Sequence, residues 1–247
     1  MNIILVGYGN VGRAFHQMID ERRDAFQAAG TELRIVGIQR SDKHIFDPNG
    51  VAVGADGWRT GVLAELLAEV DADVLVEASP TDLATGQPAL GHCRMAFRDG
   101  MDVVLANKGP LVAHHAELMH RAKEAGKRVL FEATVAGSIP VLTTRRHALA
   151  GDDILRIEGI LNGTTNYILD RMGAEGSDLD QALAEAQELG YAETDPSNDL
   201  DGLDAAAKIV IMANAILGRD IGLDDVEVEG IREVDRQAME LAREEGY

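Results

Sequence analysis

An acid-rich stretch, YAETDPSNDLDGLDAAAK at residues 191–208, ends on Lys208, one of only five lysines in a chain with 18 arginines. Asp204 and Lys208 stand four residues apart, so on a helix they share one face. The apolar run IVIMANAIL that follows predicts a buried helix, and we expect a lysine at its mouth to face a polar cavity. A lysine ammonium in such a cavity can supply a proton or stabilise a negative charge, with Asp204 orienting it.

The acidic residues of this stretch could instead have a structural role, namely stabilisation of a helix N-terminus. Acids in a first helical turn complement the helix dipole by about 0.3–1 kcal/mol each, and we assign this role to Asp195 and Asp201. The alternative explains Lys208 poorly, because a cation in the early turns of a helix opposes the same dipole. A surface pair of Asp204 and Lys208 would contribute only about 0.3–0.5 kcal/mol. We therefore expect Lys208 to face a polar cavity with Asp204 orienting it, which makes the pair a candidate catalytic unit.

The motif GYGNVG at residues 7–12 follows an apolar run and has the G-x-G-x-x-G spacing of a dinucleotide-binding loop. The first glycine permits a tight turn, the second lets the backbone approach a pyrophosphate, and the third lets helix and strand pack closely. The helix that follows offers free N–H groups to phosphate. A tight turn without a ligand is the alternative. The cofactor-binding residues expected here are Gly7, Gly9, Asn10, Val11 and Gly12.

The end of the second predicted strand, QRSD at residues 39–42, bears on the choice of cofactor. Arg40 can pair with a 2′-phosphate and Ser41 can donate a hydrogen bond to it, which favours NADP. Asp42 keeps NAD open, because a carboxylate at this place binds the ribose 2′-hydroxyl of NAD. The alternative for Arg40 is a solvated side chain on a surface loop.

The elements that must position these residues alternate along the first half of the chain. Short apolar runs predict strands, and helical patterns lie between them. This rhythm predicts an α/β fold with a doubly wound parallel sheet, which forms a dinucleotide-binding domain over residues 1–133. The strands are expected at 2–7, 33–40, 73–79, 102–107 and 128–134, and the helices at 12–29, 61–70, 86–99 and 113–125.

The pattern changes after residue 133, and we expect a smaller α+β domain for substrate binding and dimerisation at residues 134–247. Two runs, ILRIEGIL at 154–161 and VEVEGI at 226–231, predict strands. Because the sequence ends on AREEGY without a closing element, we expect this domain to be truncated at its C-terminal end. Helices are expected at 163–172, 178–189, 201–217 and from 235 to the end.

Composition narrows the classes of partner. The formal net charge of −19 argues against nucleic acid and against anionic membranes, because both attract cations. It suggests adaptation to high salt, and an ordinary acidic cytosolic protein is the alternative. No apolar run approaches the roughly 20 residues of a membrane span. Cys93 is the only cysteine, so an intramolecular disulfide is excluded, and we expect a cytoplasmic location.

Four stretches carry a resemblance that goes beyond a generic dinucleotide fold. They are ANKGPL at 106–111, FEATVAGSIPV at 131–141, GILNGTTNYIL at 159–169 and AQELGYAETDPSNDLDGLDAAAK at 186–208. With the glycine loop, they resemble the homoserine dehydrogenase family over essentially the whole chain. The last stretch is the most specific of them and the glycine loop the least. The resemblance implies a small amino-acid substrate, namely interconversion of L-homoserine and L-aspartate 4-semialdehyde with a nicotinamide cofactor.

The resemblance also implies roles for individual residues. Lys108 and Lys208 would lie at the reacting centre, with Lys108 also near the cofactor. Lys108 follows a predicted strand end, where α/β sites gather, and a surface charge is the alternative. The substrate would be bound by Gly163, Thr164, Glu193, Asp199 and Lys208, with the Glu193 and Asp199 carboxylates holding its ammonium group.

A monovalent cation site is a further implication of the resemblance. It would use backbone atoms of Glu132, Val135, Gly137 and Ile139, although Ser138 stands where glycine is more usual. The family also suggests a homodimer formed through the second domain.

Three other functions compete with this one. The first is a regulatory nucleotide-binding protein of the same fold, and the second is a dehydrogenase for another small amino acid. The third is an aldehyde dehydrogenase with a cysteine nucleophile, and it is disfavoured because Cys93 falls within a predicted helix.

Overall fold

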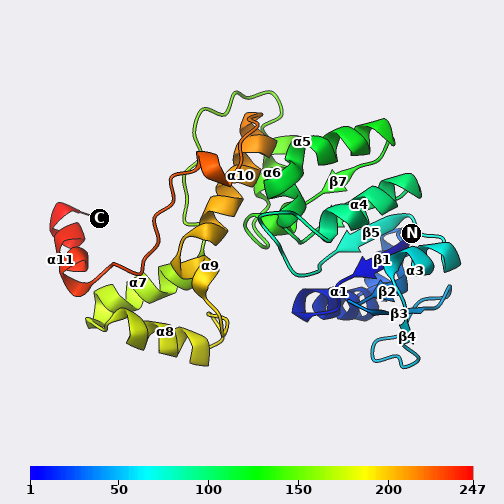
Figure 1. Cartoon of the computed structure of the whole chain (residues 1–247), viewed down its shortest axis with the longest axis horizontal. Coiled ribbons are helices and arrows are strands. Elements are labelled where there is room, and N and C mark those ends of the chain that lie inside the picture. Colours follow the sequence, from blue (N-terminus) through cyan, green and yellow to red (C-terminus); the bar gives the residue numbers. More distant parts are fainter. Residues whose placement is uncertain (247) are drawn as a thin grey trace. The chain divides into compact units, whose positions relative to one another are not determined.

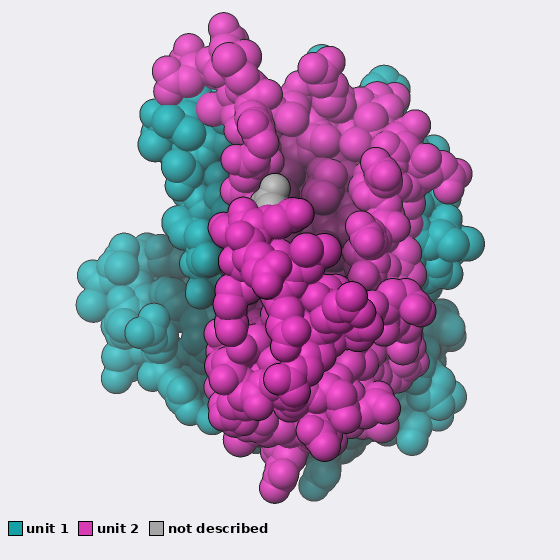
Figure 2. Space-filling view, turned by 90° about the vertical axis from the view of Figure 1, so that its left-hand side faces the viewer, with its two compact units in different colours: residues 1–150 teal, residues 151–247 magenta. Residues whose placement is uncertain are grey.

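The computed structural model describes residues 1–246 of the chain. It forms two compact units, Met1–Ala150 and Gly151–Tyr247, which Figure 2 colours separately. The structural units divide 17 residues later than the sequence pattern suggests, because residues 134–150 are grouped with the first unit. Each unit is described by itself below.

The first unit is built on a seven-stranded sheet with strand order β4-β3-β2-β1-β5-β6-β7 (Figure 1). The five runs predicted as strands form its parallel part, because β1 pairs with both β2 and β5, and β6 lies between β5 and β7. The strands are β1 (Asn2–Val6), β2 (Arg34–Gln39), β3 (Lys43–Phe46), β4 (Arg59–Thr60), β5 (Val74–Glu77), β6 (Asp102–Leu105) and β7 (Val129–Leu130). The doubly wound α/β expectation is therefore confirmed.

Two strands at one edge were not predicted. β3 and β4 pair antiparallel with β2 and with each other, and they have four and two residues. Runs this short carry too little periodicity to be recognised from sequence alone.

Helices surround this sheet, and α4 packs beside β5, β6 and α5 (Figure 1). The single helix predicted for residues 12–29 is interrupted at Arg22, whose φ and ψ of −103° and 15° are not helical. Within residues 1–246, no helix combines the length and apolar character needed to cross a bilayer. The helical segments of this unit are α1 (Asn10–Glu21), α2 (Arg23–Ala28), α3 (Leu63–Glu69), α4 (Ala89–Arg98), α5 (Gly109–Glu124), the 3-10 turn η1 (Glu132–Thr134) and α6 (Val141–His147).

Backbone hydrogen bonds tie the carboxyl ends of the central strands to one another. The N–H of Gly7, just after β1, donates to the Gln39 carbonyl, and that of Ala78 donates to Val6. The N–H of Ala106 donates in turn to Glu77. β1 has β2 on one side and β5 on the other, so the strand order reverses here. A crevice at such a switch point is where open α/β sheets bind their ligands.

The second unit is helical over its described residues. Its core packs α7 against α8 through buried residues that include Ile168, Met172 and Ala186, with Leu200 from α9. Its elements are α7 (Gly163–Glu175), α8 (Leu179–Glu188), α9 (Ser197–Leu200), α10 (Leu203–Leu217), the 3-10 turn η2 (Leu223–Asp225) and α11 (Arg236–Glu245).

The two strands predicted in this unit are not formed within residues 151–246. Residues 154–161 and 226–231 adopt no regular secondary structure. A strand requires a neighbouring backbone to complete its hydrogen bonds, and an alternating apolar pattern does not provide one. In the first segment the apolar side chains point into solvent, with Leu155 91% and Ile160 78% exposed.

Candidate active site

The glycine loop leaves space for a ligand at one of its three glycines. Gly7 has φ +93°, and a Cβ there would lie 2.3 Å from the backbone of Ala78. A Cβ on Gly12 would lie 2.1 Å from the Gly7 carbonyl oxygen. A Cβ on Gly9 would meet nothing within 4 Å. Gly7 and Gly12 are thus required for packing, while Gly9 exposes its backbone where a pyrophosphate could approach.

Helix α1 begins directly after this opening, at Asn10. Gly9 at its N-cap offers no side chain, and its first turn contains no acidic residue. Asn10 and Val11 lie in that exposed first turn, as expected from the sequence. The free N–H groups and the positive end of the helix dipole can therefore serve an anion, so these residues fit the diphosphate of a dinucleotide.

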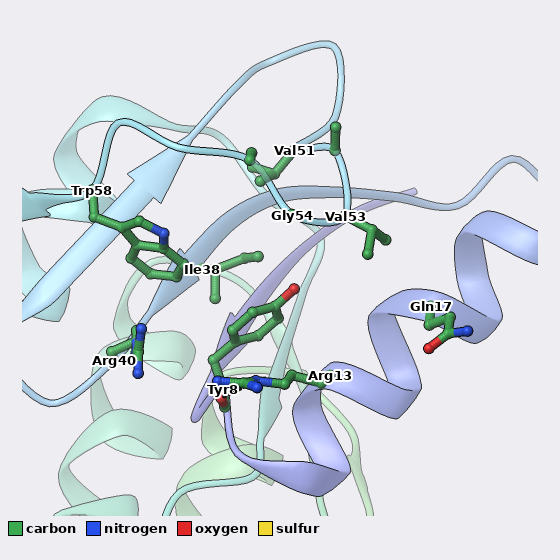
Figure 3. Close-up of a pocket in the computed structure, with 11 residues that line it drawn as sticks. Tyr8, Arg13, Gln17, Ile38, Arg40, Val51, Val53, Gly54 and Trp58 are labelled. Carbon is green, nitrogen blue, oxygen red and sulfur yellow. Dashed lines mark hydrogen bonds between the residues drawn. The ribbon is translucent and has the colours of Figure 1, made fainter.

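A cavity of about 380 Å³ lies beside this loop (Figure 3). Its walls come from the glycine loop, α1, the end of β2 and the segment between β3 and β4. The lining residues are Tyr8, Arg13, Gln17, Ile38, Arg40, Val51, Ala52, Val53, Gly54, Ala55 and Trp58.

Two guanidinium groups line this cavity, and each lies against an aromatic ring (Figure 3). The Arg40 guanidinium carbon is 5.2 Å from the Trp58 ring centre, and that of Arg13 is 5.7 Å from the Tyr8 ring centre. Neither arginine forms an ion pair with a carboxylate within residues 1–246. Stacked guanidiniums keep their N–H edges available, so the cavity can accept a phosphate in addition to the diphosphate.

The residues after Arg40 do not join this cavity. Ser41 and Asp42 are exposed, and the Ser41 hydroxyl donates to an Asp42 carboxylate oxygen at 3.3 Å. Arg40 is thus the one member of the predicted Arg40–Ser41 pair that lines the pocket.

A buried histidine holds Tyr8 in place. His16 is only 3% exposed, and its Nε2 lies 2.9 Å from the Val51 carbonyl while its Nδ1 lies 2.9 Å from the Tyr8 hydroxyl. A carbonyl can only accept, so Nε2 carries a hydrogen, and in the neutral ring Nδ1 accepts from Tyr8.

The sequence analysis missed several lining residues. Arg13 could have been noticed because it follows the last loop glycine directly. Trp58 gives no local signal, because it is far from the loop in sequence.

Lys108 is the half-buried N-cap residue of α5, just beyond the carboxyl end of β6. Its predecessor Asn107 is 2% exposed and fixes the local backbone. The Asn107 amide nitrogen donates to the carbonyls of Ser79 and Pro80, both at 3.0 Å, and its oxygen accepts from the Gly109 N–H at 2.8 Å. Lys108 is therefore held at the crevice edge of the sheet, as its position after a strand predicts.

The second unit contains a separate polar cavity of about 590 Å³. It brings together five of the predicted residues: Gly163, Thr164, Asp199, Asp204 and Lys208. Asn162, Asn166, Tyr167, Asp170 and Tyr191 complete its lining.

Lys208 projects into this cavity from the second turn of α10. Its Nζ donates to Asp204 Oδ2 at 2.7 Å and to the Leu161 carbonyl at 2.5 Å. The Lys208 and Asp204 side chains are only 15% and 17% exposed, so this is not a solvated surface pair. An ammonium group has three hydrogens, and one remains to meet a ligand. The expected Asp204–Lys208 unit in a polar cavity is thus present.

The predicted substrate carboxylates are placed differently from each other. Asp199 lines the cavity, whereas Glu193 is exposed and does not line it. The Glu193 backbone carbonyl accepts from the Gln187 amide at 3.0 Å. The assignment of Glu193 to the substrate therefore stays a prediction, without support from this arrangement.

Of the two acids assigned to a helix N-terminus, Asp195 lies at the start of α9, whereas Asp201 is the C-cap residue of that helix and pairs with an arginine. Asp195 accepts hydrogen bonds from the Ser197 hydroxyl at 2.6 Å and N–H at 3.2 Å, which lower the pKa of Asp195. Asp201 forms an ion pair with Arg232, which lowers the pKa of Asp201.

The predicted cation segment forms a turn between η1 and α6. Val135 is buried, Gly137 has φ +60°, and Ile139 is 63% exposed. The Glu132 carboxylate caps α6 by accepting from the N–H groups of Leu142 and Thr143 at 2.9 and 2.7 Å. Desolvation acts to raise the pKa of Glu132, but the hydrogen bonds from Thr143 and the backbone outweigh it, so the pKa is lowered. No group of side chains within residues 1–246 forms a metal site, so a cation here would rely on backbone oxygens.

Cys93 lies in the interior of α4 with no exposed surface. Burial and, to a lesser extent, the nearby Glu77 carboxylate raise the pKa of its thiol. A thiol that is buried and disfavoured as a thiolate is a poor nucleophile, which argues against cysteine-based aldehyde chemistry.

Comparisons with known proteins match both parts of the chain. A family model described as "Homoserine dehydrogenase, NAD binding domain" matches residues 7–132, and one described as "Homoserine dehydrogenase" matches residues 140–247. A homoserine dehydrogenase of Methanocaldococcus jannaschii is 40% identical, and the match covers 100% of this chain and 78% of that protein. An NAD(+)-dependent homoserine dehydrogenase of Pseudomonas canavaninivorans is 36% identical over 98% of this chain and 73% of its own length.

Solved structures are similar as well. A homoserine dehydrogenase of Thermoplasma acidophilum has a TM-score of 0.82 at 31% identity, with 94% of this chain and 74% of that chain covered. A structure from Archaeoglobus fulgidus has a TM-score of 0.91 at 37% identity and covers 100% of this chain and 78% of its own.

Proposed function

The chain belongs to the homoserine dehydrogenase family, and from that membership we propose how its two pockets divide the reaction. The enzyme interconverts L-homoserine and L-aspartate 4-semialdehyde. In the oxidation, the C4 carbon of homoserine loses a hydride and its hydroxyl loses a proton. The nicotinamide, when bound, supplies the hydride acceptor, and the protein binds, orients and handles the proton.

Lys208 is the residue that we assign to the proton. The supporting observation is its ammonium group, which is fixed by Asp204 and the Leu161 carbonyl at the wall of the polar cavity. In the reducing direction its remaining N–H points at the developing alkoxide, stabilises the negative charge and delivers the proton. Asp199 in the same cavity provides a carboxylate for the substrate ammonium. Lys108 assists from the crevice edge of the first unit.

Oxidation of homoserine with NADP, followed by absorbance of the reduced cofactor, tests this assignment. Replacement of Lys208 with Met should abolish most of the turnover, whereas Lys123→Met, which removes an exposed lysine of α5, should not. Normal turnover by Lys208→Met would contradict the assignment. Failure of the unaltered enzyme to oxidise homoserine, with turnover of another small amino acid, would favour the dehydrogenase of different specificity.

We propose NADP as the preferred cofactor, supported by the Arg40 guanidinium in the 380 Å³ cavity. The Pseudomonas relative is named NAD(+)-dependent, and Asp42 follows Arg40 closely, so NAD is the alternative. The ratio of kcat/KM for the two cofactors decides between them. Arg40→Ala should weaken NADP far more than NAD, with Arg22→Ala as a control for the loss of one exposed arginine charge.

We also propose a cation site in the first unit. A monovalent cation would bind backbone oxygens of the turn from Glu132 to Ile139, and replacement of K⁺ by a bulky organic cation at constant ionic strength should then lower activity.

We further propose a homodimer. It would form through the second unit, where the exposed Leu155 and Ile160 offer apolar surface. Sedimentation of Leu155→Asp against the unaltered chain tests the dimer, which that substitution should weaken.

A further inference from the structure

We propose that Asn162 is a positioning residue, which holds Asp199 and Asp204 so that substrate binding and proton transfer share one fixed geometry. The inference rests on the proposed function of this cavity. Asn162 precedes α7, is 8% exposed and lines the cavity beside both carboxylates.

The Asn162 side chain uses its whole hydrogen-bonding capacity. Its Nδ2 donates to Asp199 Oδ1 at 2.5 Å and to Asp204 Oδ2 at 3.0 Å. Its Oδ1 accepts from the Thr165 N–H at 2.9 Å and from the Thr165 hydroxyl at 3.1 Å. An amide has two donor hydrogens and two acceptor lone pairs, and all four are engaged.

These bonds join three separate elements. Asn162 is the N-cap of α7, Asp199 belongs to α9, and Asp204 lies in the first turn of α10. The preceding residue, Leu161, accepts from Lys208 through its carbonyl. Two consecutive residues therefore contact every charged group that we assign to the chemistry of this cavity.

The charges explain why an amide is needed at this place. The three charged groups bonded to Asn162 or Leu161, namely Asp199, Asp204 and Lys208, carry a formal charge of −1 together, and Asp170 adds a further carboxylate to the cavity lining. Adjacent carboxylates repel, and only a group that donates to both can hold them together. The remaining negative charge suits the ammonium group of an amino acid, while Asp204 stays bound to Lys208.

Replacement of Asn162 with Asp separates this role from helix capping. Aspartate keeps the side-chain oxygen that caps α7 and is a good N-cap residue, so the fold should persist. It removes both donor hydrogens and adds a carboxylate beside Asp199 and Asp204. We expect kcat to fall and KM for homoserine to rise, with kcat/KM lower by about 10- to 100-fold, the scale of losing charge-assisted hydrogen bonds. KM for NADP should change little, whereas the melting temperature should fall, because the new carboxylate is repelled by Asp199 and Asp204.

A double variant that exchanges the amide and the carboxylate, together with a crystal structure, completes the test. The exchange Asn162→Asp with Asp204→Asn restores the number of carboxylates but puts the donor on the wrong element, so turnover should not return. Asn162→Ala should lose both the donor hydrogens and the helix cap, without adding a charge. A crystal structure of Asn162→Asp should show Asp199 or Asp204 displaced.

Three outcomes would overturn the proposal. The first is normal kcat and KM for Asn162→Asp, and the second is an equal rise in KM for homoserine and for NADP. The third is full recovery of turnover in the double variant Asn162→Asp with Asp204→Asn. If the unaltered enzyme does not turn over homoserine, the proposed function fails at that step. The crystal structure of the variant then decides about Asn162 alone, because unmoved carboxylates would contradict the positioning role.

Discussion

The cavity that we propose for the cofactor and the cavity that we propose for the substrate balance their charged side chains in opposite ways. In the first unit, Arg13 and Arg40 line a cavity without an acidic partner and are held by aromatic rings. In the second, Lys208, Asp204 and Asn162 are bound to one another before any ligand arrives. One cavity obtains its countercharge from the ligand, and the other is preorganised from within. Changes in the first should therefore affect binding, and changes in the second should affect catalysis.

The largest expected effect is that of Lys208→Met, which removes the ammonium from the preorganised cavity. We expect kcat to fall by about 10²-fold or more, the usual scale for loss of a positioned acid or base. Asp204→Asn should also lower kcat, and the double variant should be little worse than Lys208→Met, because the two residues act as a unit. Steady-state kinetics with homoserine measure this. Near-normal kcat for Lys208→Met, with a small drop in melting temperature, would show that the Asp204–Lys208 pair only stabilises the helix.

The cofactor cavity should respond in KM instead. Arg40→Ala and Arg13→Ala each remove a guanidinium, and we expect each to lower kcat/KM for NADP by about tenfold or more, through charge-assisted hydrogen bonds worth about 1.5–3 kcal/mol. Saturating NADP should restore kcat in both. If Arg13→Ala weakens NAD and NADP equally, Arg13 contacts the diphosphate that both cofactors share and not the 2′-phosphate. A fall in kcat at saturation would break the contrast between the cavities.

A smaller effect is expected from the support of the aromatic wall. Tyr8→Phe keeps the ring but removes the hydrogen bond to His16, and neutral hydrogen bonds contribute about 0.5–1.5 kcal/mol. We expect KM for NADP to rise by a few-fold with kcat unchanged. His16→Ala should do more, because it also releases the Val51 carbonyl and leaves a void. An unchanged KM for NADP in both variants would show that cofactor binding does not depend on the hydrogen bond between Tyr8 and His16.

Salt should act on the whole molecule and not on either cavity. The net charge of −19 implies self-repulsion that ions screen, so the melting temperature should rise by several degrees between dilute and molar KCl. A melt series in KCl, with NaCl as the control for ion identity, measures this. A flat or falling melting temperature would remove the adaptation to high salt.

The smallest effect concerns Glu132, which lies outside both cavities and caps α6. Its pKa is lowered from the ordinary 4.5, so its contribution to stability is full above that value and is lost as the pH falls through the lowered one. Glu132→Gln should therefore cost about 1 kcal/mol near neutral pH and almost nothing in acid. Unfolding curves at both pH values test the sign, and an equal cost at both would contradict it.

The parts predicted from sequence are those encoded locally. GYGNVG and the five apolar runs specified the loop and the parallel strands, because glycine spacing and short buried runs act within a few residues. The Asp204–Lys208 face followed from a four-residue spacing. The residues whose position depends on distant partners were not predicted. The sequence around Trp58 or Asn162 does not indicate which cavity either residue lines.

The errors have the same origin. Residues 154–161 have an alternating pattern but no neighbouring strand within the described chain, so the pattern alone could not make one. The role of Glu193 stays a prediction, because this residue lies on an exposed loop whose direction depends on the packing of α8 and α9. Sequence reasoning identified which residue types could act, and tertiary packing decided where they point.

The two acceptors around the Lys208 nitrogen have a consequence for reversibility. A neutral amine still has two hydrogens, and the Asp204 carboxylate and the Leu161 carbonyl can accept both. The Lys208 side chain can therefore keep the same conformation with and without the third proton. Neither direction of the proposed reaction would then require the Lys208 side chain to reorient before the next proton transfer.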